Sequence, residues 1–286
     1  MLIRGLDLVV PQAWISAFII TNIASFLFPV ILHKTFGFRT ALLAVLFPTY
    51  LVFTTIPYSD VISLVLLALS VLFILRERIL VSSTSVSLAI LNFYHLAWTL
   101  PAYACEVLRT KRVRVLAFAA LPLVSGVLIL VWFKITTGNF LTYFSIEKAV
   151  WGEGITSPWG QVKWILNGWF TSQPLDLLGL RLPPVYWLVR NILFQMFYLV
   201  GAFLILKTSS QHKGFLFLYA LVAIVPLLFM TGTPAISVPR LLLPAFPVFY
   251  AYATVMKRRE HYAVYAVLSF IVAAWVTISQ TYSFFA

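Results

Sequence analysis

The sequence predicts an all-α polytopic membrane helix bundle, and three observations support that fold class. Hydrophobic residues make up 62% of the 286 residues and charged residues only 10%, against roughly 45–50% and 25% in soluble domains. Apolar runs long enough to cross a bilayer recur along the chain, and the basic residues gather in short loops between them. Polar side chains are too few to cover a soluble surface, so we expect a single transmembrane domain over residues 1–286.

Eight segments qualify as spans, because a membrane-crossing helix needs about 17–25 mostly apolar residues. They are residues 11–32, 40–56, 58–75, 113–135, 186–206, 214–230, 240–256 and 262–282. The segment 80–105 is also apolar, but it is more mixed and carries several serines together with Asn92, His95 and Pro101.

The formal net charge of +12 comes from 20 Lys and Arg against 8 Asp and Glu. The basic loops are residues 34–39, 76–78, 109–114, 207–213 and 257–259. Basic loops mark the cytoplasmic side of a membrane protein. Since the positive charge is confined to short connections between apolar runs, it argues against nucleic acid as a partner.

Both flanks of segment 80–105 are basic, so a single crossing would break the alternation of sides. We therefore expect a re-entrant or short helical hairpin that turns near residues 92–95 and faces a site, since non-helical backbone at membrane depth lines protein or water. The resulting protein is an integral multi-pass membrane protein of the cell membrane or an endoplasmic-reticulum-like membrane. Both of its termini are expected to be extracytoplasmic.

The extracytoplasmic loop 136–185 is too long for a simple connector and is rich in aromatic residues. Its apolar residues at positions 159, 162, 165, 166, 169 and 170 have helical spacing, whereas Gln161, Lys163 and Asn167 fall on the other face. This pattern predicts an interfacial helix in contact with membrane lipid. Its tryptophans form either an aromatic belt or the wall of a groove for a lipid-linked substrate.

Arg240 stands at the outer mouth of a span, where a basic residue goes against the charge bias. It either extends toward lipid headgroups or binds a phosphate, for which a guanidinium offers two parallel donors. Ser237, three residues earlier, could add a hydroxyl donor to the phosphate.

Asp60 and His95 are two further candidates. Asp60 either caps the helix that follows it or makes a polar contact in an outward-facing site, and it is a weak candidate for a catalytic residue. His95 falls at the turn of the hairpin, where it is either a hydrogen-bonded packing residue or a functional ionisable group. The other histidines, His33, His212 and His261, lie beside basic residues and are expected to be solvated.

No phosphate-binding glycine loop, HExxH or GxSxG motif occurs in the sequence. The single cysteine, Cys105, excludes an internal disulfide and a cysteine-based metal cluster. The sequence therefore points to no cofactor and supports no metal site.

Several short segments occur in an order typical of one glycosyltransferase family. They are Phe47-Pro48-Thr49, Pro57-Tyr58-Ser59-Asp60, Leu100-Pro101, Thr137-Gly138-Asn139, Trp151, Pro158-Trp159 and Ser237-Val238-Pro239-Arg240, followed by Pro244 and Pro247. In this the chain resembles the PIG-V family of mannosyltransferases, which belongs to the GT-C superfamily of multispanning glycosyltransferases. The resemblance covers most of residues 1–256.

The resemblance implies a GT-C-like bundle, a polyprenyl-phosphate sugar as donor, and a glycan or glycolipid as acceptor on the extracytoplasmic face. It also implies that Tyr58 and Trp151 join Arg240, Ser237 and His95 in binding the substrate. The family's base lies in a first outer loop, which the resemblance places before Met1 or on a partner chain that supplies the missing span. The chain departs from the family at Asp60, where Glu is usual, at Leu241, where Tyr is usual, and near Phe93, where an Arg is often present.

The leading hypothesis is thus a membrane glycosyltransferase, with mannose as the expected sugar. The alternative is a non-catalytic accessory membrane subunit of the same fold that binds the lipid-linked sugar or stabilises an enzyme. A lipid or solute transporter is a third hypothesis. It is disfavoured because the two halves show no repeat and the spans are nearly free of protonatable residues.

Overall fold

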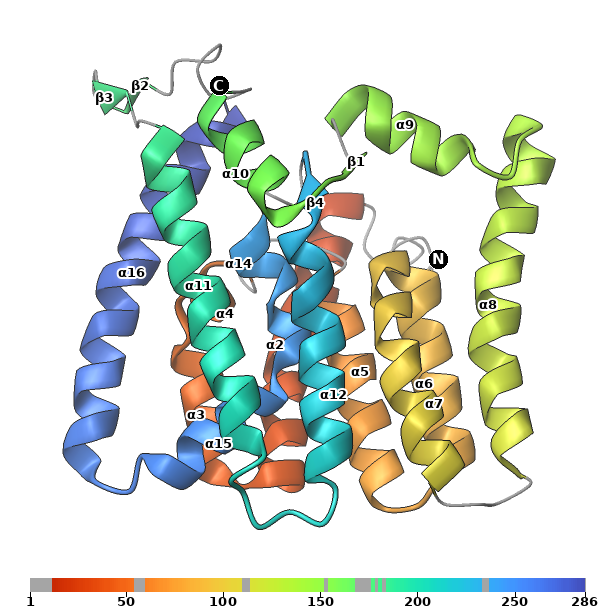
Figure 1. Cartoon of the computed structure of the whole chain (residues 1–286), viewed down its shortest axis with the longest axis horizontal. Coiled ribbons are helices and arrows are strands. Elements are labelled where there is room, and N and C mark those ends of the chain that lie inside the picture. Colours follow the sequence, from red (N-terminus) through yellow and green to blue (C-terminus); the bar gives the residue numbers. More distant parts are fainter. Residues whose placement is uncertain are drawn as a thin grey trace.

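The computed structural model of the chain is a bundle of upright helices, with smaller elements lying across one end (Figure 1). The structure describes residues 12–53, 60–109, 114–151, 154–167, 176–177, 180–181, 184–232 and 237–285. Within these residues the protein is all-α apart from four strands of two residues each. The prediction of an all-α chain is confirmed.

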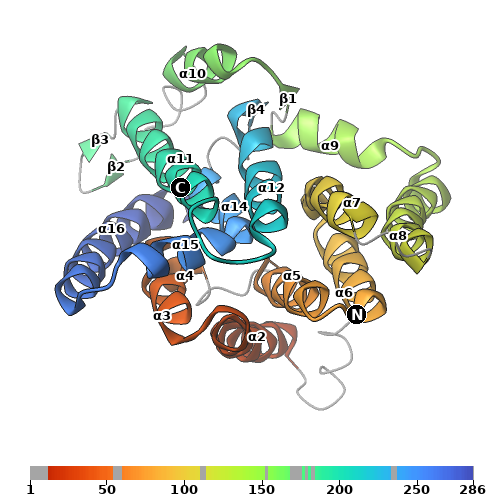
Figure 2. The same ribbon diagram turned by 60° about the horizontal axis from the view of Figure 1, so that its bottom comes forward.

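The first half of the chain forms most of the bundle. Its elements are α2 (Ala13–Phe36), α3 (Phe38–Leu46), α4 (Pro48–Phe53), α5 (Asp60–Leu75), α6 (Ile79–Asn92), the 3₁₀ helix η1 (Tyr94–Thr99), α7 (Leu100–Arg109) and α8 (Arg114–Thr137). Helix α6 packs extensively against α5 and α8. Helix α8 lies at the outer edge of the bundle, at the opposite side from α16 (Arg259–Phe285) (Figure 2).

The second half of the chain completes the bundle and covers one end. Its elements are α9 (Thr142–Trp151), β1 (Gly154–Ile155), α10 (Pro158–Asn167), β2 (Asp176–Leu177), β3 (Leu180–Arg181), α11 (Pro184–Ile205), α12 (Lys213–Ile224), η2 (Val225–Leu228), β4 (Met230–Thr231), α14 (Val238–Leu241), η3 (Leu243–Ala245), α15 (Pro247–Val255) and α16. Strand β1 pairs antiparallel with β4, and β2 pairs antiparallel with β3.

Four of the described helices are long and apolar enough to cross a membrane. They contain Trp14–Phe36, Ala120–Thr137, Trp187–Ile205 and Arg259–Thr277. A fifth candidate is the pair Val238–Ala245 and Pro247–Val255, which is bent by 75°. The chain therefore has the helices of a membrane protein, but fewer full-length ones than the eight expected from the sequence.

Prolines explain part of that difference, because proline lacks an N–H and clashes with the preceding turn of a helix. The expected span 40–56 is two short helices, α3 and α4, which meet at Phe47 and Pro48. Phe47 has an extended backbone (φ −65°, ψ 132°), as residues before proline prefer. In the expected span 240–256, Pro244 and Pro247 begin new short helices.

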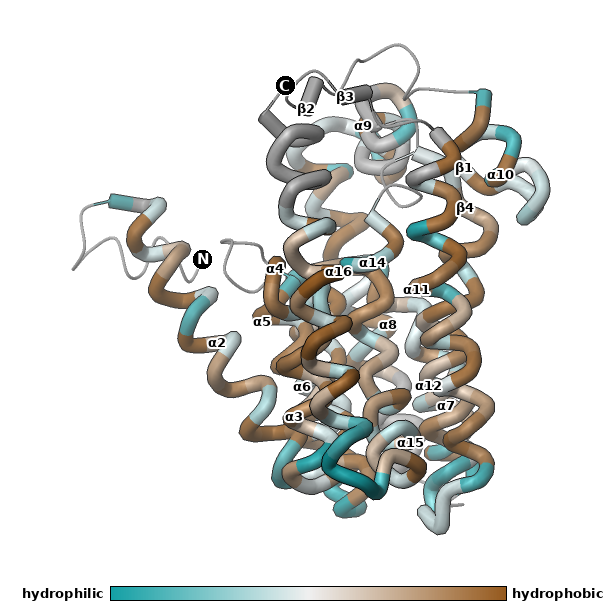
Figure 3. Tube along the Cα trace, turned by 90° about the vertical axis from the view of Figure 1, so that its left-hand side faces the viewer, coloured by the Kyte–Doolittle hydropathy of each residue, from teal (hydrophilic) through white to brown (hydrophobic). Residues whose placement is uncertain are grey.

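The segment 80–105 has the shape expected of a hairpin. Helix α6 ends at Asn92, η1 makes the turn, and α7 runs back (Figure 1). Helix α6 starts and α7 ends at the same end of the bundle as the basic connections after α2, α11 and α15. Figure 3 shows this end as the polar lower edge beneath the apolar midsections of the helices. We call it the basic end, and we call the other the capped end.

Helices α9 and α10 lie across the capped end, as expected for part of the loop 136–185 (Figure 1). The prediction for the faces of α10 was wrong at Gln161, which is buried and donates through Nε2 to the carbonyls of Leu227 (2.7 Å) and Met230 (2.5 Å). Trp159 is instead exposed on the outside of α10. The Gln161 amide joins α10 to η2 and β4, which follow α12, since buried carbonyls require donors.

The core of the bundle is aromatic where α3, α11 and α15 meet. Phe47 lies with its ring centroid 5.4 Å from that of Tyr198 and 5.2 Å from that of Phe249, both at steep interplanar angles. Edge-to-face contacts of this kind add to the stabilisation that burial provides. The break at Pro48 therefore leaves Phe47 buried in this aromatic part of the core.

Candidate functional site

Asp60 and Arg240 form an ion pair toward the capped end, with 3.0 Å between Asp60 Oδ2 and Arg240 Nε. Their side chains are only 16% and 13% exposed. Asp60 is the first residue of α5, where the helix dipole favours a negative charge. The ion pair thus joins the start of α5 to α14, two elements separated by most of the chain.

The short helix α14 positions Arg240. Pro239 lies in its first turn, where a fixed φ and a missing N–H cost nothing. The carbonyl of Ser237 accepts the N–H groups of Arg240 (2.9 Å) and Leu241 (3.0 Å). Ser237 is the residue before α14 and is itself buried, so its hydroxyl as a phosphate donor stays a prediction.

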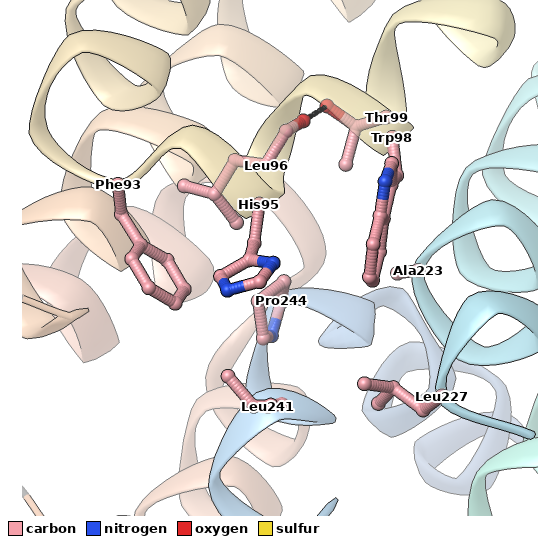
Figure 4. A pocket seen from close by; sticks show the side chains of 9 residues that line it. All are labelled: Phe93, His95, Leu96, Trp98, Thr99, Ala223, Leu227, Leu241 and Pro244. Atoms are coloured by element: carbon pink, nitrogen blue, oxygen red, sulfur yellow. Dashed lines mark hydrogen bonds between the residues drawn. The ribbon is translucent and has the colours of Figure 1, made fainter. Parts of the chain in front are cut away.

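His95 lies in η1 at the turn of the hairpin, where the sequence placed it. Its Nε2 and the hydroxyl of Tyr94 are hydrogen-bonded at 2.7 Å. The imidazole ring also packs against Phe93 and Trp98, with centroid distances of 5.0 and 5.4 Å. Figure 4 shows the ring directed toward Pro244, on the segment that follows Arg240.

Two small cavities join these groups into one region. One is lined by His95 and Trp98 and the other by Asp60 and Arg240, and the same four apolar residues line both. The shared residues are Phe93, Leu96, Leu241 and Pro244. The cavities have volumes of about 20 and 10 Å³, enough for about one water molecule each. A sugar phosphate would therefore need the hairpin turn and the α14 segment to separate.

A second polar contact connects the hairpin to α5 beside this region. Asn92, the last residue of α6, donates from Nδ2 to Ser63 Oγ over 2.7 Å. Ser63 lies one helical turn after Asp60 and lines the same cavity. The end of α6 is therefore held next to the ion pair by hydrogen bonding as well as by packing.

The structure brings Asp60, Arg240 and His95 to the same region, and Ser237 precedes the helix that carries Arg240. It is less informative on the other two candidates. Tyr58 lies outside the described residues. Trp151 is the last residue of α9 at the capped end, and its side chain lies outside the described part of the structure.

Sequence reasoning missed Arg190, which is fully buried in α11. Its guanidinium donates to Asn191 Oδ1 (3.3 Å from Nε, 3.0 Å from Nη2) and lies 4.5 Å from the Trp187 ring centroid. An arginine inside an apolar run was a usable signal, since ionisable residues at membrane depth are functional candidates. Arg190 lies in the part of α11 that approaches α10, where Trp187 packs with Ile165.

The prediction that His212 is simply solvated was wrong. Its Nδ1 lies 2.8 Å from Glu106 Oε1, at the basic end. Arg109 donates to the same carboxylate through Nε (3.0 Å) and Nη2 (2.7 Å). His212 and Glu106 are 106 positions apart, so only the packing of α7 against α12 brings them together.

Within the described residues, no three His, Cys, Asp or Glu side chains lie close enough to hold a metal ion. Comparison with protein-family models, with curated proteins and with solved structures gave no match for this chain. The functional argument therefore rests on the site itself.

Proposed function

We propose that this chain is a membrane glycosyltransferase that moves a sugar, expected to be mannose, from a polyprenyl-phosphate donor to a glycan or lipid-linked acceptor. The observation that carries the proposal is the position of Arg240. Its guanidinium is largely buried, is held by Asp60, and lies beside the hairpin turn at the end of the bundle remote from the basic loops.

In the proposed reaction, the largely buried guanidinium of Arg240 stabilises the phosphate of the donor. The donor's polyprenyl tail stays in the bilayer against the apolar helices, while its phosphate reaches the capped end. A guanidinium matches the geometry of phosphate oxygens, and positive charge stabilises the phosphate as it departs from the sugar. Arg240 has that role in the proposal, and His95, on the facing wall, contacts the donor phosphate as a second group.

The transfer also needs a base, because the acceptor hydroxyl loses its proton as its oxygen bonds to the anomeric carbon and the sugar–phosphate bond breaks. Asp60 is already paired with Arg240, so its charge serves to position the arginine. We assign the base to no residue of the described chain.

The proposed orientation follows from the charge distribution. Lys- and Arg-rich loops remain on the cytoplasmic side, so the capped end with Arg240 would be extracytoplasmic. In a GT-C-like arrangement of eight crossings, the broken pairs α3–α4 and α14–α15 would each count as one crossing. The hairpin α6–α7 would then enter from the cytoplasmic side and turn at the site.

A second candidate function is a non-catalytic subunit that holds the lipid-linked sugar for a separate enzyme. The Asp60–Arg240 ion pair favours it, because the carboxylate of Asp60 is engaged in holding Arg240, which leaves donor binding as the task of this pair. The two functions share donor binding and differ only in transfer.

The test measures binding of a short-chain polyprenyl-phosphate mannose to the purified chain, together with transfer to an acceptor. Arg240→Ala should weaken donor binding roughly 10- to 100-fold, since a hydrogen bond to a charged group contributes about 1.5–3 kcal/mol. Arg258→Ala is the matched control, because Arg258 is exposed at the basic end. Binding of the same prenyl phosphate without a sugar separates phosphate recognition from sugar recognition.

Unchanged donor affinity in a folded Arg240→Ala protein would refute the phosphate role of Arg240. Donor binding that depends on Arg240 but is never followed by transfer would select the accessory function. Thermal unfolding of each variant shows whether a loss of binding reflects a loss of fold.

A further inference from the structure

A second cavity lies at the basic end of the bundle, remote from Arg240. It has a volume of about 270 Å³ and is lined by residues from the α5–α6 turn, the end of α7 and the residue before α12. Four of its lining side chains are ionisable: Glu77, Glu106, Arg109 and His212. It is more than ten times the volume of either cavity near Arg240.

The inner wall of this cavity is a fixed polar cluster. Glu106 is only 5% exposed, and its Oε1 accepts from both Arg109 and His212. Arg109 is 57% exposed, and its bonds to Glu106 use Nε and Nη2 but not Nη1. A carboxylate oxygen accepts more than one hydrogen bond, so Glu106 Oε2, which accepts from Arg109 Nε, has capacity for a further donor.

The outer wall contains Glu77, whose backbone has a positive φ of 58°. No other non-glycine residue in the described part of the chain has a positive φ. This conformation costs a residue with a Cβ roughly 1–2 kcal/mol and favours glycine. A carboxylate is thus held at the cavity mouth where a glycine would form the turn more easily, and such local strain often accompanies function.

The mixture of charges restricts the ligand. A simple anion would meet the carboxylates of Glu77 and Glu106, and a simple cation would meet the guanidinium of Arg109. A ligand with one positive and one negative group satisfies both sets. The positive group should be a primary ammonium, because it donates hydrogen bonds to carboxylates whereas a quaternary ammonium does not.

We propose that this cavity binds the phosphoethanolamine headgroup of an aminophospholipid. The ammonium lies between Glu77 and the open capacity of Glu106, and the phosphate lies against Arg109, where a guanidinium provides paired donors. Basic pockets between membrane helices bind the headgroups of anionic lipids. Two carboxylates in the lining change the preference from an anionic lipid to a zwitterionic one.

The surface around the cavity identifies a lipid as the source of the headgroup. Ile74, Ile79 and Val107 provide the apolar part of the lining. Leu80 and Leu108, which follow Ile79 and Val107 in the sequence, are 62% and 68% exposed. Acyl chains would contact these exposed leucines while the headgroup occupies the cavity.

The test measures binding of dihexanoyl phosphatidylethanolamine to the full chain in detergent by native mass spectrometry. Dihexanoyl phosphatidylcholine and chain-free glycerophosphoethanolamine serve as comparison ligands. The ethanolamine lipid should bind at least about fivefold more tightly than the choline lipid and than the chain-free headgroup. Glu77→Gln should abolish the preference for ethanolamine over choline without changing affinity for the choline lipid.

The matched control is Glu260→Gln, because Glu260 is an exposed glutamate at the start of α16, and it should leave the preference unchanged. Equal binding of the two lipids by the wild type, or a preference that survives in Glu77→Gln, would overturn the proposal. If chain-free glycerophosphoethanolamine bound as tightly as the ethanolamine lipid, the claim that the ligand is a lipid would be wrong. Glu77→Gln removes a charge from an exposed turn and should fold, whereas Glu106→Gln could fail for structural reasons.

Discussion

Arg240 and Arg109 both form ion pairs with carboxylates, but their environments differ. The Arg240–Asp60 pair is largely buried on both sides, whereas Arg109 is mostly exposed and only its partner Glu106 is buried. Burying both members of an ion pair carries a desolvation cost that the Coulomb attraction offsets only in part. A buried pair is therefore weak evidence of a stabilising role, which agrees with the phosphate-binding role that we propose for Arg240.

The Glu106 cluster makes stability depend on pH. Burial raises the pKa of Glu106, but hydrogen bonds from Arg109 and His212 outweigh burial, so the pKa lies below its ordinary value of 4.5. Below a pH of about 4.5 the unfolded chain therefore binds more protons at this residue than the folded chain does. The stabilisation is complete above that value, and it is lost as the pH falls through the lower pKa of the folded state.

We therefore expect Glu106→Gln to lower the thermal unfolding temperature at pH 7 and to lower it less at pH 3.5. The reason is that pH 3.5 lies below 4.5, so the carboxyl is largely protonated in the unfolded wild type and its charge stabilises the fold less. Unfolding of both proteins in the same detergent at the two pH values provides the measurement, with Glu260→Gln as the exposed control. A deficit of equal size at both pH values would contradict the role of the Glu106 charge.

At the scale of elements, hydropathy alone was enough to predict the long helices α2, α8, α11 and α16, because an apolar run of that length has few alternatives to a helix. Predicting the helix breaks requires the conformational limits of proline as well. Pro48 separates α3 from α4 within a segment that is continuous by composition alone. The orientation of α10 could not be predicted, because Gln161 bonds to carbonyls 66 and 69 residues away. No local pattern contains that information.

The packing of α11 against α15 depends on one glycine. A Cβ added at Gly201 would lie 2.7 Å from Val248 Cβ and 2.9 Å from Tyr252 Cε2. Gly126, in the exposed helix α8, has nothing within 4 Å of the same position. The two glycines therefore form a matched pair for testing how closely these two helices must approach.

Gly201→Ala should lower the free energy of unfolding by about 1–3 kcal/mol, the usual cost of overpacking. Gly126→Ala should raise it by up to about 1 kcal/mol, because alanine favours the helix interior more than glycine does. Thermal unfolding in a single detergent measures both changes. Stabilisation by both substitutions would mean that α11 and α15 lie farther apart than in this structure.

At the scale of the whole molecule, the basic connections and the candidate site lie at opposite ends of the bundle. The connections after α2, α5, α11 and α15 and the end of α7 lie at the basic end, whereas the Asp60–Arg240 pair and the helices α9 and α10 lie toward the capped end (Figure 1). The positive-inside rule predicts from this asymmetry that the basic end faces the cytoplasm. The clustering of site residues on one side was predictable from that rule, but the pairing of Asp60 with Arg240 required the three-dimensional fold.

Labelling of single cysteines tests the orientation directly. Cys105, the only cysteine in the sequence, is first replaced by serine, and a new cysteine is then placed at Gln211 or at Ile155, both of which are exposed. In intact cells a membrane-impermeant maleimide should label Ile155→Cys, at the capped end, at once. Gln211→Cys, at the basic end, should react only after the membrane is permeabilised. The reverse pattern would place Arg240 on the cytoplasmic side, where a donor presented from outside could not reach it. Labelling of both positions in intact cells would show that the protein inserts in two orientations, which a charge bias of this size should prevent.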